Sequence, residues 1–224
     1  RDSSTSRGLG DVYKRQGVDN IDISKCTDQG IVVTNIPDYC LEEVSDHAIA
    51  MILSLNRRIS DHSNMVKDGG WHDLNLDIPV QRLSNSVLGI VGFGRIGKTI
   101  AKRVSGLGVK CVAYDPLLQS GSSIEGVSIV EFKDLLEKSD FITVHVPLND
   151  KTYHLFSEKE FEQMKNNAIL VNCARGGLID ETAASKALSD NKIGGIGLDV
   201  IEDTSSSPNS PLFGNKNVII TPHT

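Results

Sequence analysis

Residues 87–97 read Val-Leu-Gly-Ile-Val-Gly-Phe-Gly-Arg-Ile-Gly, and this stretch decides the fold. An apolar β-type run, Val87–Val91, leads into a Gly-x-Gly-x-x-Gly pattern formed by Gly92, Gly94 and Gly97, and the apolar residues that follow recur at helical spacing. Gly92 permits a tight turn, Gly94 lets a ligand approach the backbone, and Gly97 lets a helix pack closely on the strand. The N-terminus of that helix offers free N–H groups and partial positive charge. The stretch therefore predicts a strand–turn–helix unit that binds the pyrophosphate of a dinucleotide.

Glycines also mark ordinary turns, so a plain strand–helix turn is the alternative. A second expected strand, Val109–Tyr114, is followed by Asp115, 18 residues after Gly97. An acidic residue at about this spacing binds the ribose hydroxyls of NAD. Because a carboxylate also repels a 2′-phosphate, Asp115 favours NAD over NADP.

Composition excludes several classes of protein. The 224 residues carry a formal net charge of −6 and are 39% hydrophobic, which is enough for a large core but gives no electrostatic support for binding nucleic acid or an anionic membrane. No apolar run approaches the length of a membrane span, and the polar N-terminus is no secretory signal. The four cysteines form no Cys-x-x-Cys pair; they are Cys26, Cys40, Cys111 and Cys173. We therefore expect free thiols, a cytoplasmic location and no metal site.

The N-terminal part of the sequence is less regular. Residues 1–16 show no periodicity, and we expect a non-native or disordered leader there. Val18–Ile23 suggests a loop leading into a helix, and the β-branched run Gly30–Ile36 predicts a strand. Glu42–Arg58 has helical periodicity, and Ile59–Ser86 is expected to be a long polar loop that is functional or packs on a partner.

The helix predicted over residues 42–58 is apolar on two faces. One face carries Val44, Ala48, Met51, Ile52 and Leu55, and the other carries Ile49, Ala50 and Leu53. Burial on both faces suits a subunit interface, and a helix buried within the core of one chain is the alternative.

Strands and helices alternate after the glycine pattern. The expected strands cover residues 109–114, 127–130, 140–146, 168–172, 195–200 and 218–221, and the expected helices cover 96–106, 131–138, 157–164 and 181–190. This alternation predicts an α/β fold with a doubly wound parallel sheet of the Rossmann type. The strands are almost wholly apolar, which is typical of a sheet covered on both faces.

Polar side chains follow several of these strands. Arg175 and His223 follow expected strands and Asp199 lies at the end of one, at the edge where a doubly wound sheet binds its ligands. A single such residue could be a cap or part of a salt bridge. Three at successive strand ends predict a site beside the glycine pattern.

Four motifs resemble those of the D-isomer-specific 2-hydroxyacid dehydrogenases. They are Leu88–Gly97, His145–Leu148, Asn172–Asp180, and Gly197–Val200 together with Thr221–His223. The resemblance extends from Gly17 to Thr224, and the phosphoglycerate dehydrogenases and the C-terminal-binding-protein-like branch are the most similar groups. It implies that residues 17–38 are a remnant of a substrate domain. Residues 39–224 would be the NAD-binding domain, with a dimerisation helix and arm at 42–80, so the sequence would be a fragment that forms a homodimer.

The resemblance also implies roles for individual residues. The reaction would be hydride exchange between NAD and a D-2-hydroxy acid or 2-keto acid, such as phosphoglycerate, hydroxypyruvate or glyoxylate. His223 would be the catalytic acid and base, since an ordinary histidine pKa of about 6.5 suits both directions. Arg175 would bind the substrate carboxylate or keto group, and Asp199 the nicotinamide carboxamide; each could instead be purely structural. The implied cofactor-binding set is Gly92, Gly94, Arg95, Ile96, Gly97, Asp115, His145, Val146, Pro147, Thr152, Cys173, Ala174, Arg175, Asp199 and His223.

One position departs from the family pattern. The family has a glutamate five residues after the aspartate of the Leu-Asp-Val motif, which pairs with the catalytic histidine and raises its pKa. Here Thr204 occupies that position and Glu202 precedes it. Either Glu202 substitutes, or the pair is broken and His223 is less basic. The alternative to an enzyme is an NAD(H)-sensing transcriptional corepressor or binding protein like the C-terminal-binding proteins.

Overall fold

The computed structural model describes residues 21–36, 38–71, 80–203, 205 and 208–224. The chain divides into two compact units, one that ends at Glu43 and one that covers Val44–Thr224. The predicted leader over residues 1–16 lies outside the described residues. Among those described, no helix is both long and apolar enough to cross a bilayer.

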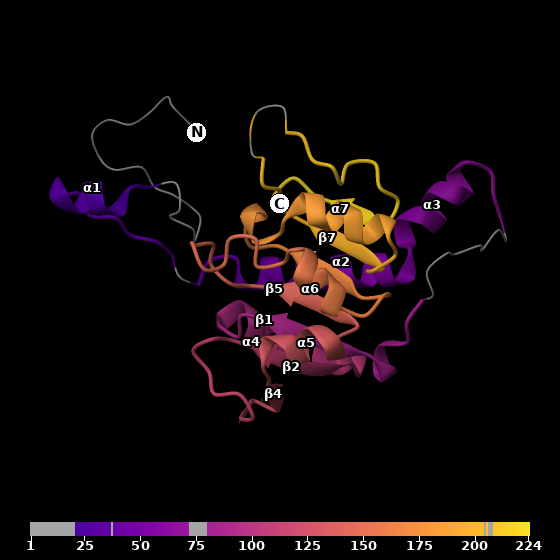
Figure 1. Cartoon of the computed structure of the whole chain (residues 1–224), viewed down its shortest axis with the longest axis horizontal. Helices are drawn as coiled ribbons and strands as arrows, with labels where there is room; N and C mark the ends of the chain where they lie inside the picture. Colours follow the sequence, from indigo (N-terminus) through magenta and orange to yellow (C-terminus); the bar gives the residue numbers. More distant parts are fainter. Residues whose placement is uncertain (1–20, 37, 72–79, 204, 206–207) are drawn as a thin grey trace. The chain divides into compact units, whose positions relative to one another are not determined.

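The larger unit is built on one eight-stranded sheet (Figure 1). Its strands are β1 (Val87–Val91), β2 (Lys110–Tyr114), β3 (Ser123–Ile124), β4 (Val127–Ile129), β5 (Phe141–Val144), β6 (Ile169–Asn172), β7 (Gly195–Leu198) and β8 (Val218–Ile220). They lie in the order β3-β4-β2-β1-β5-β6-β7-β8, and all pairs are parallel except β3 with β4. Chain order reverses at β1, which pairs with β2 on one side and β5 on the other. This is the doubly wound Rossmann topology that the alternation predicts.

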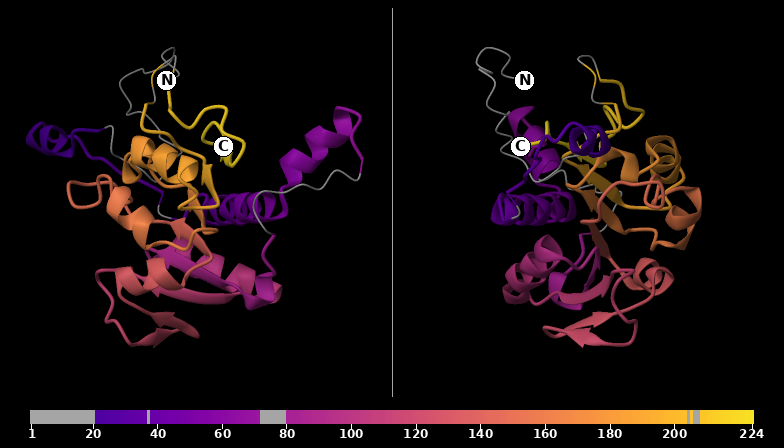
Figure 2. Two further views of the ribbon diagram at one scale, coloured as in Figure 1. Left: turned by 45° about the vertical axis from the view of Figure 1, so that its right-hand side comes forward. Right: turned by 90° about the vertical axis from the view of Figure 1, so that its left-hand side faces the viewer.

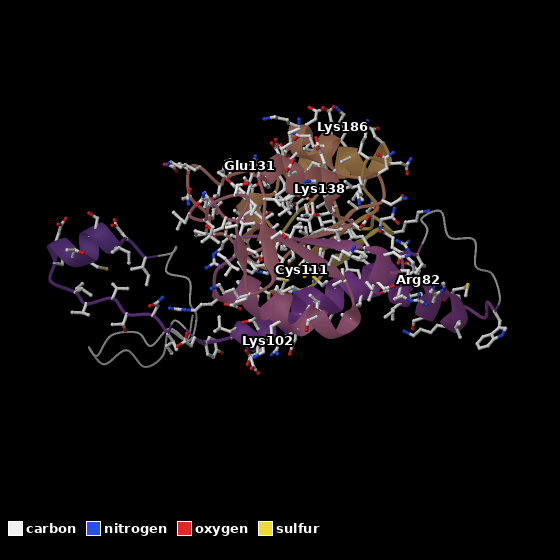
Figure 3. The ribbon with its side chains drawn as sticks, turned by 90° about the horizontal axis from the view of Figure 1, so that it is seen from below. Arg82, Lys102, Cys111, Glu131, Lys138 and Lys186 are labelled. Carbon is white, nitrogen blue, oxygen red and sulfur yellow. The ribbon has the colours of Figure 1, made fainter. Side chains whose placement is uncertain are left out.

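Helices cover both faces of the sheet (Figure 2). One face holds α4 (Arg95–Val104) and α2 (Leu41–Arg57, which crosses the boundary between the two units), and the other holds α5 (Phe132–Lys138), α6 (Glu158–Gln163) and α7 (Glu181–Ser189). Figure 3 shows Lys102 of α4 on one side and Lys138 and Lys186, of α5 and α7, on the opposite side, with Cys111 of β2 between them.

Side chains of the central strands alternate between two apolar cores. In β6, Ile169 and Val171 belong to the core beneath α2 and α4, whereas Leu170 belongs to the core beneath α5, α6 and α7. All three are buried, as expected for a strand covered on both faces. The sheet is therefore held between two apolar cores.

The predicted strand Gly30–Ile36 is wrong. This segment follows α1 (Ile23–Asp28), which begins near the end of the loop predicted over 18–23. Residues 31–36 have no regular structure. Ile31 is 53% exposed and Val32 85% exposed, so the β-branched side chains are not buried. A strand needs a neighbour and a covered face, and among the described residues this segment pairs with no strand of the sheet.

The prediction of a loop throughout Ile59–Ser86 is also wrong. Arg58 adopts a left-handed conformation that ends α2, and the chain then forms α3 (Ile59–Lys67) and, later, the short 3₁₀ helix Leu83–Asn85. Only Ile59, Met65 and Val66 of the nine residues of α3 are apolar and none of the nine is buried, so the segment resembles a polar loop. Residues 72–79 of the predicted loop lie outside the described part of the chain.

Candidate cofactor and catalytic site

The turn between β1 and α4 is shaped by its three glycines. Gly92 has φ of +93°, and a Cβ there would lie 2.5 Å from the carbonyl oxygen of His145. A Cβ on Gly97 would lie 2.3 Å from the carbonyl oxygen of Gly92, so the helix touches the turn. A Cβ on Gly94 would meet no atom within 4 Å. Packing within the protein therefore does not require a glycine at position 94. The open space beside it lies at the N-terminus of a ten-residue helix.

Asp115 follows β2 and is tied to the same turn. Its Oδ2 accepts a hydrogen bond from the Phe93 amide (3.0 Å), and its Oδ1 accepts one from the Leu117 amide (3.0 Å). The carboxylate is therefore held beside the glycine turn and is half-buried. Arg95 and Ile96 form the first turn of α4, where backbone amides have no acceptor within the helix.

His145 follows β5 and lies against the glycine turn. Its Nε2 is 2.8 Å from the Thr143 hydroxyl, and its buried Nδ1 has no hydrogen-bond partner among the described residues. Burial lowers the pKa of His145 to about 3. The ring is therefore neutral at physiological pH and leaves one polar atom for a ligand or a water.

Acidification should destabilise the fold through His145. The pKa is depressed from an unfolded value of 6.5 to about 3, so the unfolded chain takes up a proton first. The stability contributed by the neutral ring is complete above pH 6.5 and is lost as the pH falls toward 3, at about 1.4 kcal/mol per pH unit. Urea unfolding at pH 7.5 and pH 5 measures the loss of unfolding free energy between the two pH values. His145→Asn should make that loss smaller. An equal loss of unfolding free energy in the unsubstituted chain and in His145→Asn would contradict the expectation.

The segment after His145 forms a closed turn. Val146 is buried and Pro147 is exposed. The Thr152 hydroxyl donates to the carbonyl of Pro147 (2.7 Å) and accepts from the amide of Asn149 (2.8 Å). Thr152 thereby fixes the loop after β5, and its hydroxyl is occupied by these internal bonds.

The loop after β6 is organised by Asn172. Its side chain accepts from the Ala174 amide (2.9 Å) and donates to the Arg175 carbonyl (2.8 Å). The Arg175 guanidinium donates to the carbonyl of Ala174 (2.7 Å) and is half-buried. Gly176 follows, and a Cβ there would lie 2.0 Å from the carbonyl oxygen of Ile201. The Arg175 loop is therefore in backbone contact with the loop after β7.

Cys173 is a buried thiol at the same strand end. Burial, and then the charge of Asp199, raises the pKa of Cys173 to about 12. The side chain is therefore a protonated thiol at physiological pH, and it contributes to the wall of the site by its shape. Ala174, the next residue, is half-buried.

Asp199 is the buried carboxylate of the site. Its Oδ1 accepts from the Thr221 hydroxyl (2.6 Å), the Thr224 amide (3.1 Å) and the Thr224 hydroxyl (3.3 Å). His47 Nε2 lies 3.5 Å from the same oxygen. These contacts join the ends of β7 and β8 and fix the chain on either side of His223, which is exposed and has φ of +62°.

Glu202 has partners other than His223. Its Oε1 accepts from the Tyr153 hydroxyl (2.7 Å), and both of its oxygens lie 3.2 Å from His154 Nε2. The Tyr153 and His154 rings stack with centroids 3.9 Å apart. The hydrogen bond to Glu202 is the main cause that raises the pKa of Tyr153. Thr204, the other residue of the predicted departure, lies outside the described residues.

The sequence-predicted residues thus gather along one edge of the sheet, each following β1, β2, β5, β6, β7 or β8. Gly92 packs against His145 and Val146, and Asp115 accepts a hydrogen bond from the glycine turn. Cys173 lies close enough to Asp199 to feel its charge. His47 had no local signal, since its partner Thr221 is 174 residues away. Asn172 begins the Asn172–Asp180 motif, and the structure adds that its side chain holds the loop. Among the described residues, no group of three histidine, cysteine or acidic side chains could hold a metal.

Comparison with known proteins gives a consistent assignment. The chain is 43% identical over 215 residues to the glyoxylate reductase of Thermococcus litoralis, covering 92% of this chain and 64% of that protein. It is 40% identical over 208 residues to D-3-phosphoglycerate dehydrogenase of Archaeoglobus fulgidus, covering 92% and 39%. The solved structure of D-lactate dehydrogenase from Aquifex aeolicus, complexed with NAD and lactic acid, matches with a TM-score of 0.84 and 34% identity over 94% of this chain and 67% of that one.

The chain spans less than two thirds of the length of these two sequence relatives. Residues 49–224 match the family described as "D-isomer specific 2-hydroxyacid dehydrogenase, NAD binding domain". This confirms the predicted family and the cofactor class of the domain. The chain belongs to the D-isomer-specific 2-hydroxyacid dehydrogenases.

Proposed function

We propose that this chain binds NAD at the carboxyl edge of its sheet and contributes to hydride exchange with a D-2-hydroxy acid or 2-keto acid. The open space over Gly94 is the main support. Packing does not require a glycine there, and Gly94 lies at the N-terminus of α4, where a phosphate can bind. The residues present therefore fit a pyrophosphate. Asp115, held beside the turn by Phe93, is placed to accept hydrogen bonds from the adenosine ribose.

The remaining residues divide between cofactor and substrate. On this proposal the nicotinamide cofactor would accept a hydride in oxidation and donate one in reduction, and His145, Val146 and Cys173 form walls of its site. The Asp199 carboxylate accepts a hydrogen bond from the nicotinamide carboxamide. Arg175, always charged, binds the substrate carboxylate through parallel hydrogen bonds. His223 holds the proton that the substrate oxygen gains in reduction and gives up in oxidation.

The substrate is proposed by chemical class. The relatives are named as reductases or dehydrogenases of glyoxylate, glycerate, phosphoglycerate and lactate, all of which are small 2-hydroxy or 2-keto acids. We place residues 17–38 in a substrate domain and 39–224 in the cofactor domain. We also propose a cytoplasmic homodimer that uses the segment 42–80, since Ala50 on the second face of α2 is exposed and Ile49 and Leu53 are only half-buried.

Oxidation of NADH by the full-length protein with glyoxylate, hydroxypyruvate, pyruvate and phosphohydroxypyruvate tests the proposal, with NADH binding measured separately by fluorescence. We expect binding, together with turnover of at least one acid. Binding without turnover of any acid would favour the NAD-sensing alternative. Absence of NADH binding would overturn both functions.

Glu202→Gln tests whether Glu202 replaces the family glutamate. Its carboxylate is held by Tyr153 and His154, so we expect the pH dependence of turnover to match that of the unsubstituted chain. The pKa of Tyr153 should fall toward its ordinary value, because the bond to Glu202 is what chiefly raises it. Tyrosinate absorbance in a pH titration reports this, with Tyr153→Phe as the control. Loss of the alkaline limb of the activity profile in Glu202→Gln would instead make Glu202 the partner of His223.

A further inference from the structure

A histidine from the helical layer reaches the buried carboxylate of the site. His47 lies in α2, and its Nε2 is 2.9 Å from the Thr221 hydroxyl and 3.5 Å from Asp199 Oδ1. The side chain of His47 is 27% exposed and that of Asp199 is 6% exposed. A ring on α2 is therefore linked to the ends of both β7 and β8.

The direction of these hydrogen bonds follows from counting protons. A hydroxyl has one proton to donate, and the 2.6 Å contact of Thr221 with a carboxylate oxygen uses it. Thr221 Oγ1 can then only accept from His47, so Nε2 carries a proton. The chain of donation runs from His47 to Thr221 to Asp199.

This arrangement selects one oxygen of the carboxylate. The contacts from Thr221, from Thr224 and from the His47 ring all converge on Oδ1 of Asp199. The carboxylate cannot rotate about its axis without breaking them. Oδ2 is consequently the oxygen left for a ligand, and its direction is fixed before a ligand arrives.

We propose that His47 is a positioning residue for the nicotinamide end of the cofactor site, acting through Thr221 on Asp199. The inference rests on the proposed function, in which Asp199 accepts a hydrogen bond from the nicotinamide carboxamide. An acceptor whose orientation is already fixed loses less freedom on binding, so His47 strengthens that one bond without touching the cofactor. The helix that contributes His47 is thereby coupled to recognition of the carboxamide.

The test compares His47→Leu, which removes the donor, with His47→Gln, which keeps an N–H donor at similar reach. Three ligands separate the effects: NADH, reduced 3-acetylpyridine adenine dinucleotide, which lacks the amide N–H, and ADP-ribose, which lacks the nicotinamide ring. We expect His47→Leu to raise the Kd for NADH about tenfold and to change the other two little, since one oriented hydrogen bond is weakened. His47→Gln should restore most of the affinity for NADH.

Controls separate this role from folding and from failure of the proposed function. Thr221→Val should reproduce the effect of His47→Leu, and the double variant should lose little more, because both act on one oxygen. His62→Leu, on α3, should bind all three ligands normally. An unchanged Kd for NADH in His47→Leu would overturn the inference, and so would equal weakening of NADH and ADP-ribose. If the unsubstituted chain binds neither, the proposed function itself fails.

Discussion

Replacing Gly97 with alanine should destabilise the fold, whereas replacing Gly94 with alanine should leave the fold intact and weaken the binding of NADH. The added Cβ at position 97 would lie 2.3 Å from the backbone oxygen of Gly92 and 3.1 Å from Ile90 Cγ2. Both belong to β1 and its turn, which cannot yield without moving the centre of the sheet. We expect the free energy of unfolding to fall by about 3 kcal/mol.

At Gly94 the same substitution meets nothing within 4 Å, and φ is −79°, so alanine is unstrained. The free energy of unfolding should change by less than about 0.5 kcal/mol. The methyl group would, however, occupy the path by which a pyrophosphate approaches the helix N-terminus, and the Kd for NADH should rise at least about tenfold. Gly106→Ala, which also meets no neighbour, is the matched control and should alter neither quantity.

Thermal unfolding and fluorescence titration with NADH measure the two effects separately. Normal NADH affinity in a folded Gly94→Ala variant would place the pyrophosphate elsewhere. Full stability of Gly97→Ala would show that the turn between β1 and α4 can relax.

Replacing His223 with glutamine should abolish most of the turnover without preventing NADH from binding. On the proposed function, its imidazole is the group that exchanges a proton with the substrate oxygen, and glutamine cannot do so at any accessible pH. Loss of a general acid and base should lower kcat about 10³-fold. Affinity for NADH should change by less than about threefold, because Asp115 and the glycine turn carry most of that binding.

The measurement uses whichever 2-keto acid the unsubstituted chain reduces, at saturating NADH. His62→Gln, a substitution on α3, is the matched control for removing a histidine. A kcat within tenfold of the unsubstituted value would exclude His223 as the catalytic acid and base.

Local patterns determine which parts of the molecule can be read from sequence. The strand–turn–helix unit at the glycine pattern and the parallel strands are confirmed, because each depends on residues close together in the chain or on burial of both faces of a strand. The role of Asp115 in binding the ribose stays a prediction. The predicted ends of strands and helices differ by one or two residues, since fraying and capping decide the last turn. The two-residue β3 was missed because it is too short to show a pattern.

Other features depend on partners that are distant in sequence. Gly30–Ile36 has strand-forming residues, yet the segment pairs with no strand among the described residues, and β propensity alone does not form a strand. α3 has only three apolar residues and none of its residues is buried, so its sequence resembles a polar loop. His47 can be recognised as part of the site only when α2 is placed against the end of β8, because Thr221 is its hydrogen-bond partner.

The close approach of Gly176 to Ile201 limits which changes of loop length this protein can tolerate. Because the two backbones touch, the Arg175 loop and the loop that carries Glu202 form one unit rather than two adjustable arms. An insertion or deletion in either loop would displace the other, so length changes should be tolerated only as compensating pairs. Adaptation toward a different acid is therefore easier by exchanging side chains on this edge than by remodelling its loops.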